Sequence, residues 1–148
     1  MFWQPIYQLL NIVRHAYWFV FHPDTLGVKV VIEQNDKYLF IRHGYGSKRW
    51  TFPGGGIKKN ETPSDAVRRE TKEEVCINLK DLRPLGTFQN HYEYKNDTVH
   101  AYYATTDADT ITPRRGEIIA YGWFPKEDLP KEISIAAQET LTLLGLPD

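Results

Sequence analysis

Apolar and polar residues alternate along most of the chain with the periods of strands and helices. Runs rich in branched and aromatic residues predict strands at 26–32, 38–41, 50–52, 85–94, 99–105 and 118–124. Turn pairs at Asn35-Asp36 and Asn96-Asp97 predict two hairpins. Helices are expected at 63–75 and 134–144, the latter capped by Ser134. Strands with few, separated helices indicate an α/β (α+β) fold whose mixed sheet is covered on both faces.

Residues 1–25 form a separate, aromatic-rich N-terminal segment. Its apolar side chains recur at helical spacing and predict an amphipathic helix: Trp3, Ile6, Leu10, Val13, Tyr17 and Val20. Polar residues at 11, 14 and 15 interrupt it, so no run reaches the ~18 residues of a membrane span. We expect this helix to pack on the domain or on a second subunit of a homodimer, with contact to a membrane surface as the alternative.

Composition restricts the class of protein. A chain of 148 residues with 41% hydrophobic and 25% charged residues fits one globular domain, here 26–148. The formal net charge of −1 argues against a general nucleic-acid binder, because no basic excess is present to neutralise phosphates. Cys76 is the single cysteine, which excludes an intrachain disulfide and suits a reducing cytoplasm.

Three glutamates share one face of the helix predicted over 63–75. Glu70, Glu73 and Glu74 lie at i, i+3 and i+4, within an arc of roughly 100°. Like charges so placed repel by roughly 0.2–0.5 kcal/mol per pair, whereas a divalent cation would reverse the sign of that interaction. Such a face suits Mg²⁺ or Mn²⁺, with waters and substrate phosphates as further ligands. A solvated acidic stripe is the alternative interpretation.

The residues before this helix favour the metal site. Thr62 can serve as the N-cap and Pro63 suits the first helical position. Upstream, the glycine loop at 53–56 allows close approach of the backbone to a ligand, because its glycines carry no Cβ. Glu61 precedes Arg69 by eight residues, and an ion pair between them would tie the loop to the helix.

The stretch from Gly55 to Ile77 resembles the Nudix box, G-x5-E-x7-R-E-U-x-E-E-x-G-U, in which U is aliphatic. The matching residues are Gly55, Glu61, Arg69, Glu70, Glu73, Glu74 and Ile77. Thr71 occupies the first U position, and Cys76 replaces the second glycine, where a left-handed helix cap is usual. That replacement removes no metal ligand and is expected either to cost about 1 kcal/mol of local stability or to end the helix differently.

The resemblance implies a Nudix-type α/β/α sandwich and hydrolysis of a nucleoside diphosphate linked to another moiety, with Mg²⁺ or Mn²⁺ as cofactor. It implies that Glu70, Glu73, Glu74 and the Gly55 carbonyl bind metal, and that Glu73 or Glu74 orients the attacking water. By motif position, Arg69 positions the glutamates and Glu61 holds Arg69. The expected activity is that of a pyrophosphohydrolase acting on a small nucleotide or dinucleotide.

The general base and the substrate contacts lie outside the box. Glu117 is the candidate base because GEIIAYGWF is similar to the family's downstream pattern; a solvated loop carboxylate is the alternative, and Glu93 is a weaker candidate. Arginine can pair with phosphate and aromatic rings can stack on a base. On this ground substrate contacts are expected, with core packing as the alternative for each, among Arg42, His43, Tyr45, Arg49, Trp50, His91, Tyr92, Tyr94 and Tyr102.

Two classes of function remain open at this point. One is a metal-dependent pyrophosphohydrolase; the other is a Nudix-fold module that binds a nucleotide without cleaving it. A sensor could dispense with the helix glutamates and Arg69, and all of them are present. The sequence therefore favours the enzyme.

Overall fold

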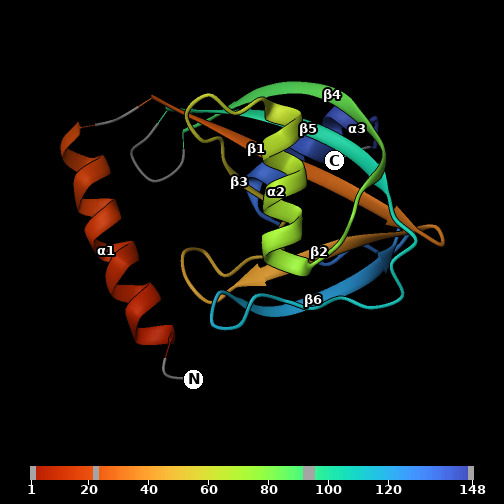
Figure 1. The fold of residues 1–148 in the computed structure, drawn as a ribbon, viewed down its shortest axis with the longest axis horizontal. Coiled ribbons are helices and arrows are strands. Elements are labelled where there is room, and N and C mark those ends of the chain that lie inside the picture. Colours follow the sequence, from red (N-terminus) through yellow and green to blue (C-terminus); the bar gives the residue numbers. More distant parts are fainter. Residues whose placement is uncertain (1–2, 22–23, 92–95, 147–148) are drawn as a thin grey trace.

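A six-stranded mixed sheet lies between helices in the computed structural model, which describes residues 3–21, 24–91 and 96–146 (Figure 1). The elements in chain order are α1 (Gln4–Phe21), β1 (Asp24–Gln34), β2 (Lys37–His43), β3 (Gly54–Gly56), α2 (Pro63–Val75), β4 (Lys80–Asn90), β5 (Asn96–Thr105), β6 (Ile118–Pro125) and α3 (Ile135–Leu144). The helix expected at 63–75 is confirmed at both ends, and Ser134 caps α3 as predicted.

The two faces of the sheet carry two separate hydrophobic cores. Val28, Val30 and Ile32 of β1 pack with Ala66 and Val67 of α2. The opposite face, represented by Val31 of β1 and Phe40 of β2, packs with Ala137 and Leu141 of α3. Alternation along the strands thus sends successive side chains to different helices. The predicted α/β/α sandwich with a mixed sheet is confirmed.

The sheet opens between β1 and β2, and this opening positions the glycine-rich segment. The strand order is β4-β5-β1-β2-β6, but β1 and β2 pair only next to their turn at Asn35-Asp36. Farther along, β3 pairs with β1 and fills the gap. The expectation of a loop at 53–56 is therefore wrong for 54–56, which form a strand; glycine permits it because a Cβ on Gly54 would collide with the Val28 backbone.

The second predicted hairpin is confirmed as an antiparallel pair, β4 with β5, but its turn was misplaced. Asn96 and Asp97 belong to β5 and pair in parallel with Asp24 and Thr25 of β1. The Thr25 hydroxyl donates to Asp97 Oδ1 at 2.7 Å, so these polar side chains join strands instead of forming a turn. Residues 92–95, which include part of the strand predicted at 85–94, lie outside the described residues.

The C-terminus of α2 adopts the cap expected of glycine, although Cys76 occupies it. Cys76 has φ 59° and ψ 38°, and its N–H donates to the Lys72 carbonyl. This left-handed conformation is costly for a residue with a Cβ. We expect Cys76→Gly to raise the free energy of unfolding by about 0.5–1 kcal/mol, measured by denaturant titration. An unchanged or lower value would contradict the presence of strain at this cap.

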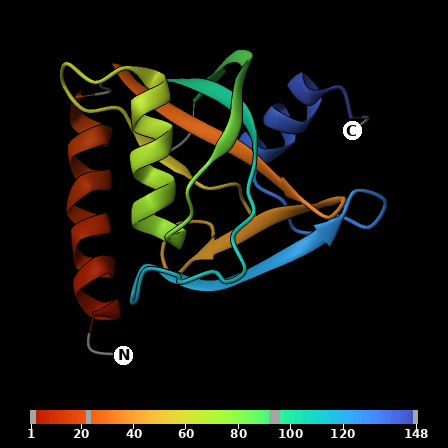
Figure 2. The same cartoon turned by 45° about the vertical axis from the view of Figure 1, so that its right-hand side comes forward.

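Helix α1 lies beside the sandwich, with its N-terminal end next to the loop that precedes β6 (Figures 1 and 2). Most of its apolar side chains are exposed, among them Ile6, Leu9, Leu10, Ile12, Val13, Phe19 and Val20. The predicted helix is present and contacts the domain, but only part of its surface is covered. Within the described residues no helix has the length and apolar character required to cross a bilayer.

Candidate active site

Arg69 joins the loop before α2 to the helix itself. Its guanidinium pairs with both carboxylate oxygens of Glu61, at 2.7 and 2.9 Å, and donates to the Gly56 carbonyl at 2.9 Å. The hydrogen bonds from Arg69 lower the pKa of Glu61 to about 2. The ion pair expected between residues 61 and 69 is therefore present. It holds the end of β3 and the loop before α2 against the middle of the helix.

We expect Glu61→Gln to lower the melting temperature without metal, because it removes the charge that pairs with Arg69. Since the folded-state pKa of Glu61 lies below its ordinary 4.5, its contribution is complete above pH 4.5 and is lost as the pH falls towards 2. The melting temperatures of wild type and Glu61→Gln should therefore converge over that range. The matched control is Glu139→Gln, at an exposed position of α3, which should leave the melting temperature unchanged. A thermally silent Glu61→Gln would mean that the pair contributes nothing.

The three glutamates of α2 have different surroundings, although they share one helix. Glu74 is 1% exposed; its Oε1 accepts from the Gly54 N–H at 2.8 Å and its Oε2 lies 3.0 Å from His43 Nε2. The Glu70 carboxylate lies against Gly55, leaving no room for a Cβ there. Glu73 is more exposed and contacts Arg69 at 3.3 Å. The three glutamates therefore differ in burial, because α2 packs on the sheet through its Glu74 side.

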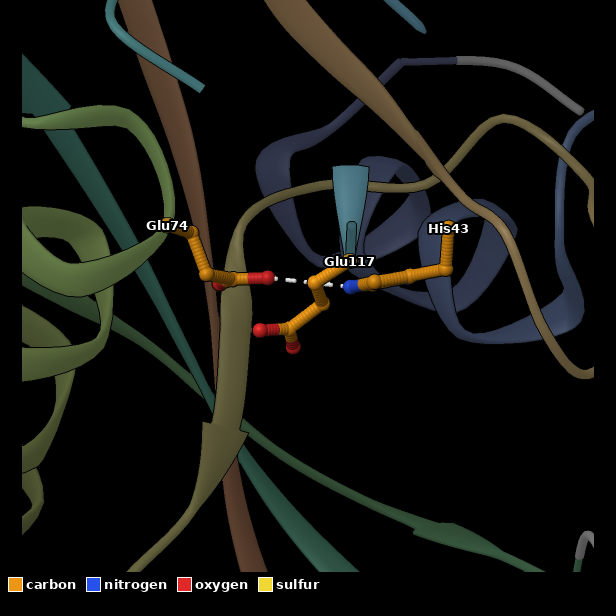
Figure 3. Close-up of side chains that lie close together, drawn as sticks. All are labelled: His43, Glu74 and Glu117. Carbon is orange, nitrogen blue, oxygen red and sulfur yellow. Dashed lines mark hydrogen bonds and ion pairs between the residues drawn. The ribbon is translucent and has the colours of Figure 1, made fainter. Parts of the chain in front are cut away.

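Glu74 meets two residues from outside the box. Ligand atoms of His43, Glu74 and Glu117 lie within 4.8 Å of one another, at the end of β2, on α2 and just before β6, respectively (Figure 3). Figure 3 shows the His43 ring directed at Glu74, with the Glu117 carboxylate beside them. A nitrogen and two carboxylates so placed form a set of donors that a divalent cation can bind.

Glu117 is held on both of its carboxylate oxygens. The Tyr45 hydroxyl donates to Oε1 at 3.0 Å, and Arg114 Nε lies 3.3 Å from Oε2. Burial and the charge of Glu117 raise the pKa of Tyr45, so the phenol keeps its proton and acts as a donor. The alternative of a solvated loop carboxylate at 117 is therefore wrong, since the side chain is only 15% exposed.

A cavity of about 910 Å³ adjoins this cluster. Its wall includes His43, the strand Gly54–Gly56 and the carboxylate-bearing residues Glu70 and Glu117. Basic residues also line it: Arg14, Lys29, Lys48, Arg49, Lys58 and Lys59. The cavity thus combines acidic residues, suited to cations, with basic residues, suited to phosphates.

Only some of the described residues expected to contact substrate line the cavity. His43, Tyr45 and Arg49 line the cavity. Arg42 and Trp50 are not among its described lining residues: the Arg42 guanidinium lies over the Trp50 ring, 5.5 Å from its centroid, and Arg42 Nε donates to the Lys48 carbonyl. These two side chains contact each other, and their contact with substrate stays a prediction.

The structure describes only some of the substrate-contact residues predicted on the β4–β5 hairpin. His91 is exposed, hydrogen-bonds to Asn96 at 2.9 Å and is not among the described lining residues. Tyr102 packs against the core under α2. Tyr94, Tyr92 and Glu93 lie outside the described residues. Sequence reasoning missed Lys58 and Lys59, which line the cavity one residue beyond the glycine run.

The charge balance of the site fits divalent cations. Burial and, after it, the negative charge of Glu74 raise the pKa of Glu70, whereas the hydrogen bond from Arg69 lowers it. Among the described residues of the site, Arg69 pairs with Glu61, Glu70 and Glu73, and Arg114 pairs with Glu117. The fifth carboxylate, Glu74, is bonded to His43 and to the Gly54 N–H instead. Carboxylate and carbonyl oxygens are the donors that Mg²⁺ and Mn²⁺ accept. The donor set therefore fits the cofactor that the resemblance implies.

Comparison with known proteins places the chain in a family. The NUDIX domain family matches residues 23–144, so the chain belongs to the NUDIX domain family. Solved structures of similar fold include a MutT NUDIX hydrolase from Burkholderia pseudomallei (TM-score 0.76, 23% identity, covering 82% of this chain and 98% of that one). A NUDIX family hydrolase from Clostridium perfringens has a TM-score of 0.69 and 29% identity, covering 81% of this chain and 97% of that one.

Curated relatives match a shorter segment. An RNA pyrophosphohydrolase of Vibrio atlanticus (strain LGP32) is 40% identical over 70 residues, which is 47% of this chain and 41% of that protein. An RNA pyrophosphohydrolase of Yersinia enterocolitica is 42% identical over 66 residues, 45% of this chain and 37% of that protein. The chain thus aligns with about two fifths of the length of these relatives.

Proposed function

We propose that the protein is a divalent-metal-dependent pyrophosphohydrolase that cleaves a phosphoric anhydride bond in a nucleoside diphosphate derivative. The observation that carries this proposal is the convergence of Glu74 with His43 and Glu117 beside a cavity lined by basic side chains. Family membership and the names of the curated relatives support the same reaction class.

The side chains of the site have different proposed roles, which follow from their positions. Glu70 and Glu74, with the Gly55 carbonyl, would hold Mg²⁺ or Mn²⁺, and Glu73 remains a further candidate ligand. The bound cations supply a polarised phosphoryl oxygen and a water of lowered pKa. Arg69 holds Glu70 at 2.9 Å and is a positioning residue. We assign Glu117 as the group that accepts the proton of the attacking water, since Tyr45 and Arg114 fix its carboxylate.

Substrate phosphates are expected at the basic residues of the cavity. Lys58 and Lys59 lie one residue after the end of β3, and Lys48 and Arg49 lie on the loop after Tyr45. A diphosphate linking two groups would place its negative charge between these cations and the bound metal. The relatives named RNA pyrophosphohydrolases make a 5′-phosphorylated RNA end a second candidate for the same chemistry. A net charge of −1 favours a small nucleotide over extended contact with RNA.

A substrate panel tests the proposal. Purified protein is incubated with Mg²⁺ or Mn²⁺ and nucleoside triphosphates, dinucleoside polyphosphates, nucleoside diphosphate sugars or a 5′-triphosphorylated RNA oligonucleotide. Phosphate or pyrophosphate release, or a nucleoside monophosphate product, that requires the metal is the expected result. Binding of panel members without turnover by any of them would favour the alternative, a nucleotide-sensing module.

We also propose that a second copy of the chain covers the apolar side of α1. The exposed residues Leu9, Ile12 and Val13 are 61–65% accessible and would bury apolar surface in a homodimer. Sedimentation of the full chain should then show a dimer, and Ile12→Asp should yield a monomer. A monomeric wild type would contradict this assignment without affecting the proposed chemistry.

A further inference from the structure

Helix α1 contacts the two loops that carry candidate catalytic groups. The Gln4 Nε2 amide donates to the Gly116 carbonyl at 2.7 Å, directly before Glu117. The same side chain lies over Gly44, where an added Cβ would come within 2.5–2.9 Å of the Gln4 carboxamide. Gly44 in turn donates its N–H to the Glu117 carbonyl at 2.9 Å. Gln4 therefore covers the point at which the loop after β2 is joined to the loop before β6.

Tyr7, one turn farther along α1, reaches the partners of the Glu117 carboxylate. Its ring is stacked with that of Tyr45, with centroids 6.4 Å apart and an interplanar angle of 11°. Tyr45 is the donor to Glu117 Oε1. The pKa of Arg114, the partner of Oε2, is raised by the charge of Glu117 and further by Tyr7. One side chain of α1 thus adjoins both groups that fix the candidate base.

The N-terminal end of α1 also packs closely on Gly116, a position that requires glycine for two reasons. Its φ of +85° is unfavourable for other residues, and a Cβ there would lie 2.8 Å from Trp3 Cβ and 3.3 Å from Tyr7. The N-terminal turn of α1 therefore fits against the loop that delivers Glu117. By contrast, much of the apolar surface of the same helix is exposed. Trp3, Gln4 and Tyr7 thus contact the loops beside the candidate active site.

We propose that α1, which lies outside the matched family domain, is a positioning element of the active site. Gln4 and Tyr7 hold the 44–45 and 116–117 segments so that the Glu117 carboxylate faces the His43–Glu74 pair. The inference rests on the proposed hydrolase function. Misplacement of a catalytic group by about 1 Å can cost about 100-fold in rate, so contacts that fix the carboxylate of Glu117 are sufficient to control turnover.

The test compares Gln4→Ala and Tyr7→Leu with the matched control Gln8→Ala. Gln8 is an exposed residue on the same helix, so its substitution removes the same side chain away from the site. Steady-state kinetics use the panel member that the wild type hydrolyses fastest. We expect kcat to fall at least tenfold in Gln4→Ala and Tyr7→Leu, with KM within twofold of wild type and no change in Gln8→Ala. Melting temperatures establish that each variant is folded.

A second readout does not depend on activity. The Gly44 amide donates to the Glu117 carbonyl beneath Gln4, so its hydrogen exchange, followed by NMR, reports on the joined loops. Exchange of this amide should accelerate at least tenfold in Gln4→Ala and Tyr7→Leu and remain unchanged in Gln8→Ala.

The outcomes separate the two proposals. Unchanged Gly44 exchange, or unchanged kcat in both variants beside an active wild type, would overturn the role of α1 and leave the hydrolase function standing. An effect of equal size in Gln8→Ala would also overturn it, because the helix would then act through general stability. A wild type that hydrolyses no panel member with either metal contradicts the hydrolase function itself, and with it any role of α1 in turnover.

Discussion

Glu117→Gln should reduce turnover by about 10²–10⁴-fold while leaving the affinity for substrate near that of wild type. Removal of a general base has an effect of this size because the proton of the attacking water loses its acceptor. Glutamine keeps the shape of the side chain and can still accept a hydrogen bond from Tyr45. Single-turnover kinetics and equilibrium binding of the same substrate measure the two quantities separately.

The position of Glu117 near Glu74 and His43 allows a second role, as a metal ligand, and metal titration distinguishes the two. If Glu117 acts only as the base, excess Mn²⁺ will not restore activity to Glu117→Gln. Recovery at high Mn²⁺ would instead make the residue a ligand. Near-native turnover at ordinary metal concentration would exclude both roles and leave Glu73 or Glu74 as the base. Glu127→Gln, at an exposed site after β6, is the matched control.

Glu74→Gln should remove most of the stabilisation that Mn²⁺ or Mg²⁺ gives to the wild type. A ligand present at 100 times its Kd stabilises the folded state by about 2.7 kcal/mol. For a chain of this size that corresponds to a rise in melting temperature of roughly 5–10 °C. Glutamine at 74 can still accept from the Gly54 N–H, so the metal-free protein should remain folded. Thermal melts with and without metal give the comparison.

Substitution of the other two helix glutamates should reduce the metal-induced rise in melting temperature to different extents. Glu70→Gln should also weaken the metal effect, since its carboxylate lies against Gly55, whose carbonyl is a candidate ligand. Glu73 is more exposed and bonded to Arg69, so Glu73→Gln should reduce the shift less. Equal metal-induced shifts in wild type and in all three variants would rule out the metal site.

Local patterns predicted the α2 region because its determinants are close in sequence. The cap at Thr62, the helix from Pro63 to Val75 and the Glu61–Arg69 pair all depend on residues a few positions apart. The contact between His43 and Glu74 spans 31 residues and arises only when β2 and α2 pack on the same sheet. No periodicity within either segment contains that information.

Other features that the sequence did not predict also depend on tertiary packing. Arg42 and Trp50 have the right chemistry for a phosphate and a base, but the Arg42 side chain lies over the Trp50 ring. The glycines at 54–56 are typical of a loop, but they form a strand paired with β1, in which a Cβ on Gly54 would meet the Val28 backbone and one on Gly55 would meet the Glu70 carboxylate. The role of α1 at the site depends equally on which loops lie beneath Gln4.

The parallel pairing of β1 with β5 has a consequence for the order in which the protein folds. Partners in this pair, such as Thr25 and Asp97, are 72 residues apart, so closing the sheet costs more chain entropy than forming the β1–β2 turn. Folds dominated by such distant pairings reach the native state in milliseconds to seconds. The Tyr45–Glu117 contact spans an equal distance along the chain. Binding competence should therefore appear late in refolding, after α2 has formed, and Mn²⁺ added during refolding would report the final closure of the sheet.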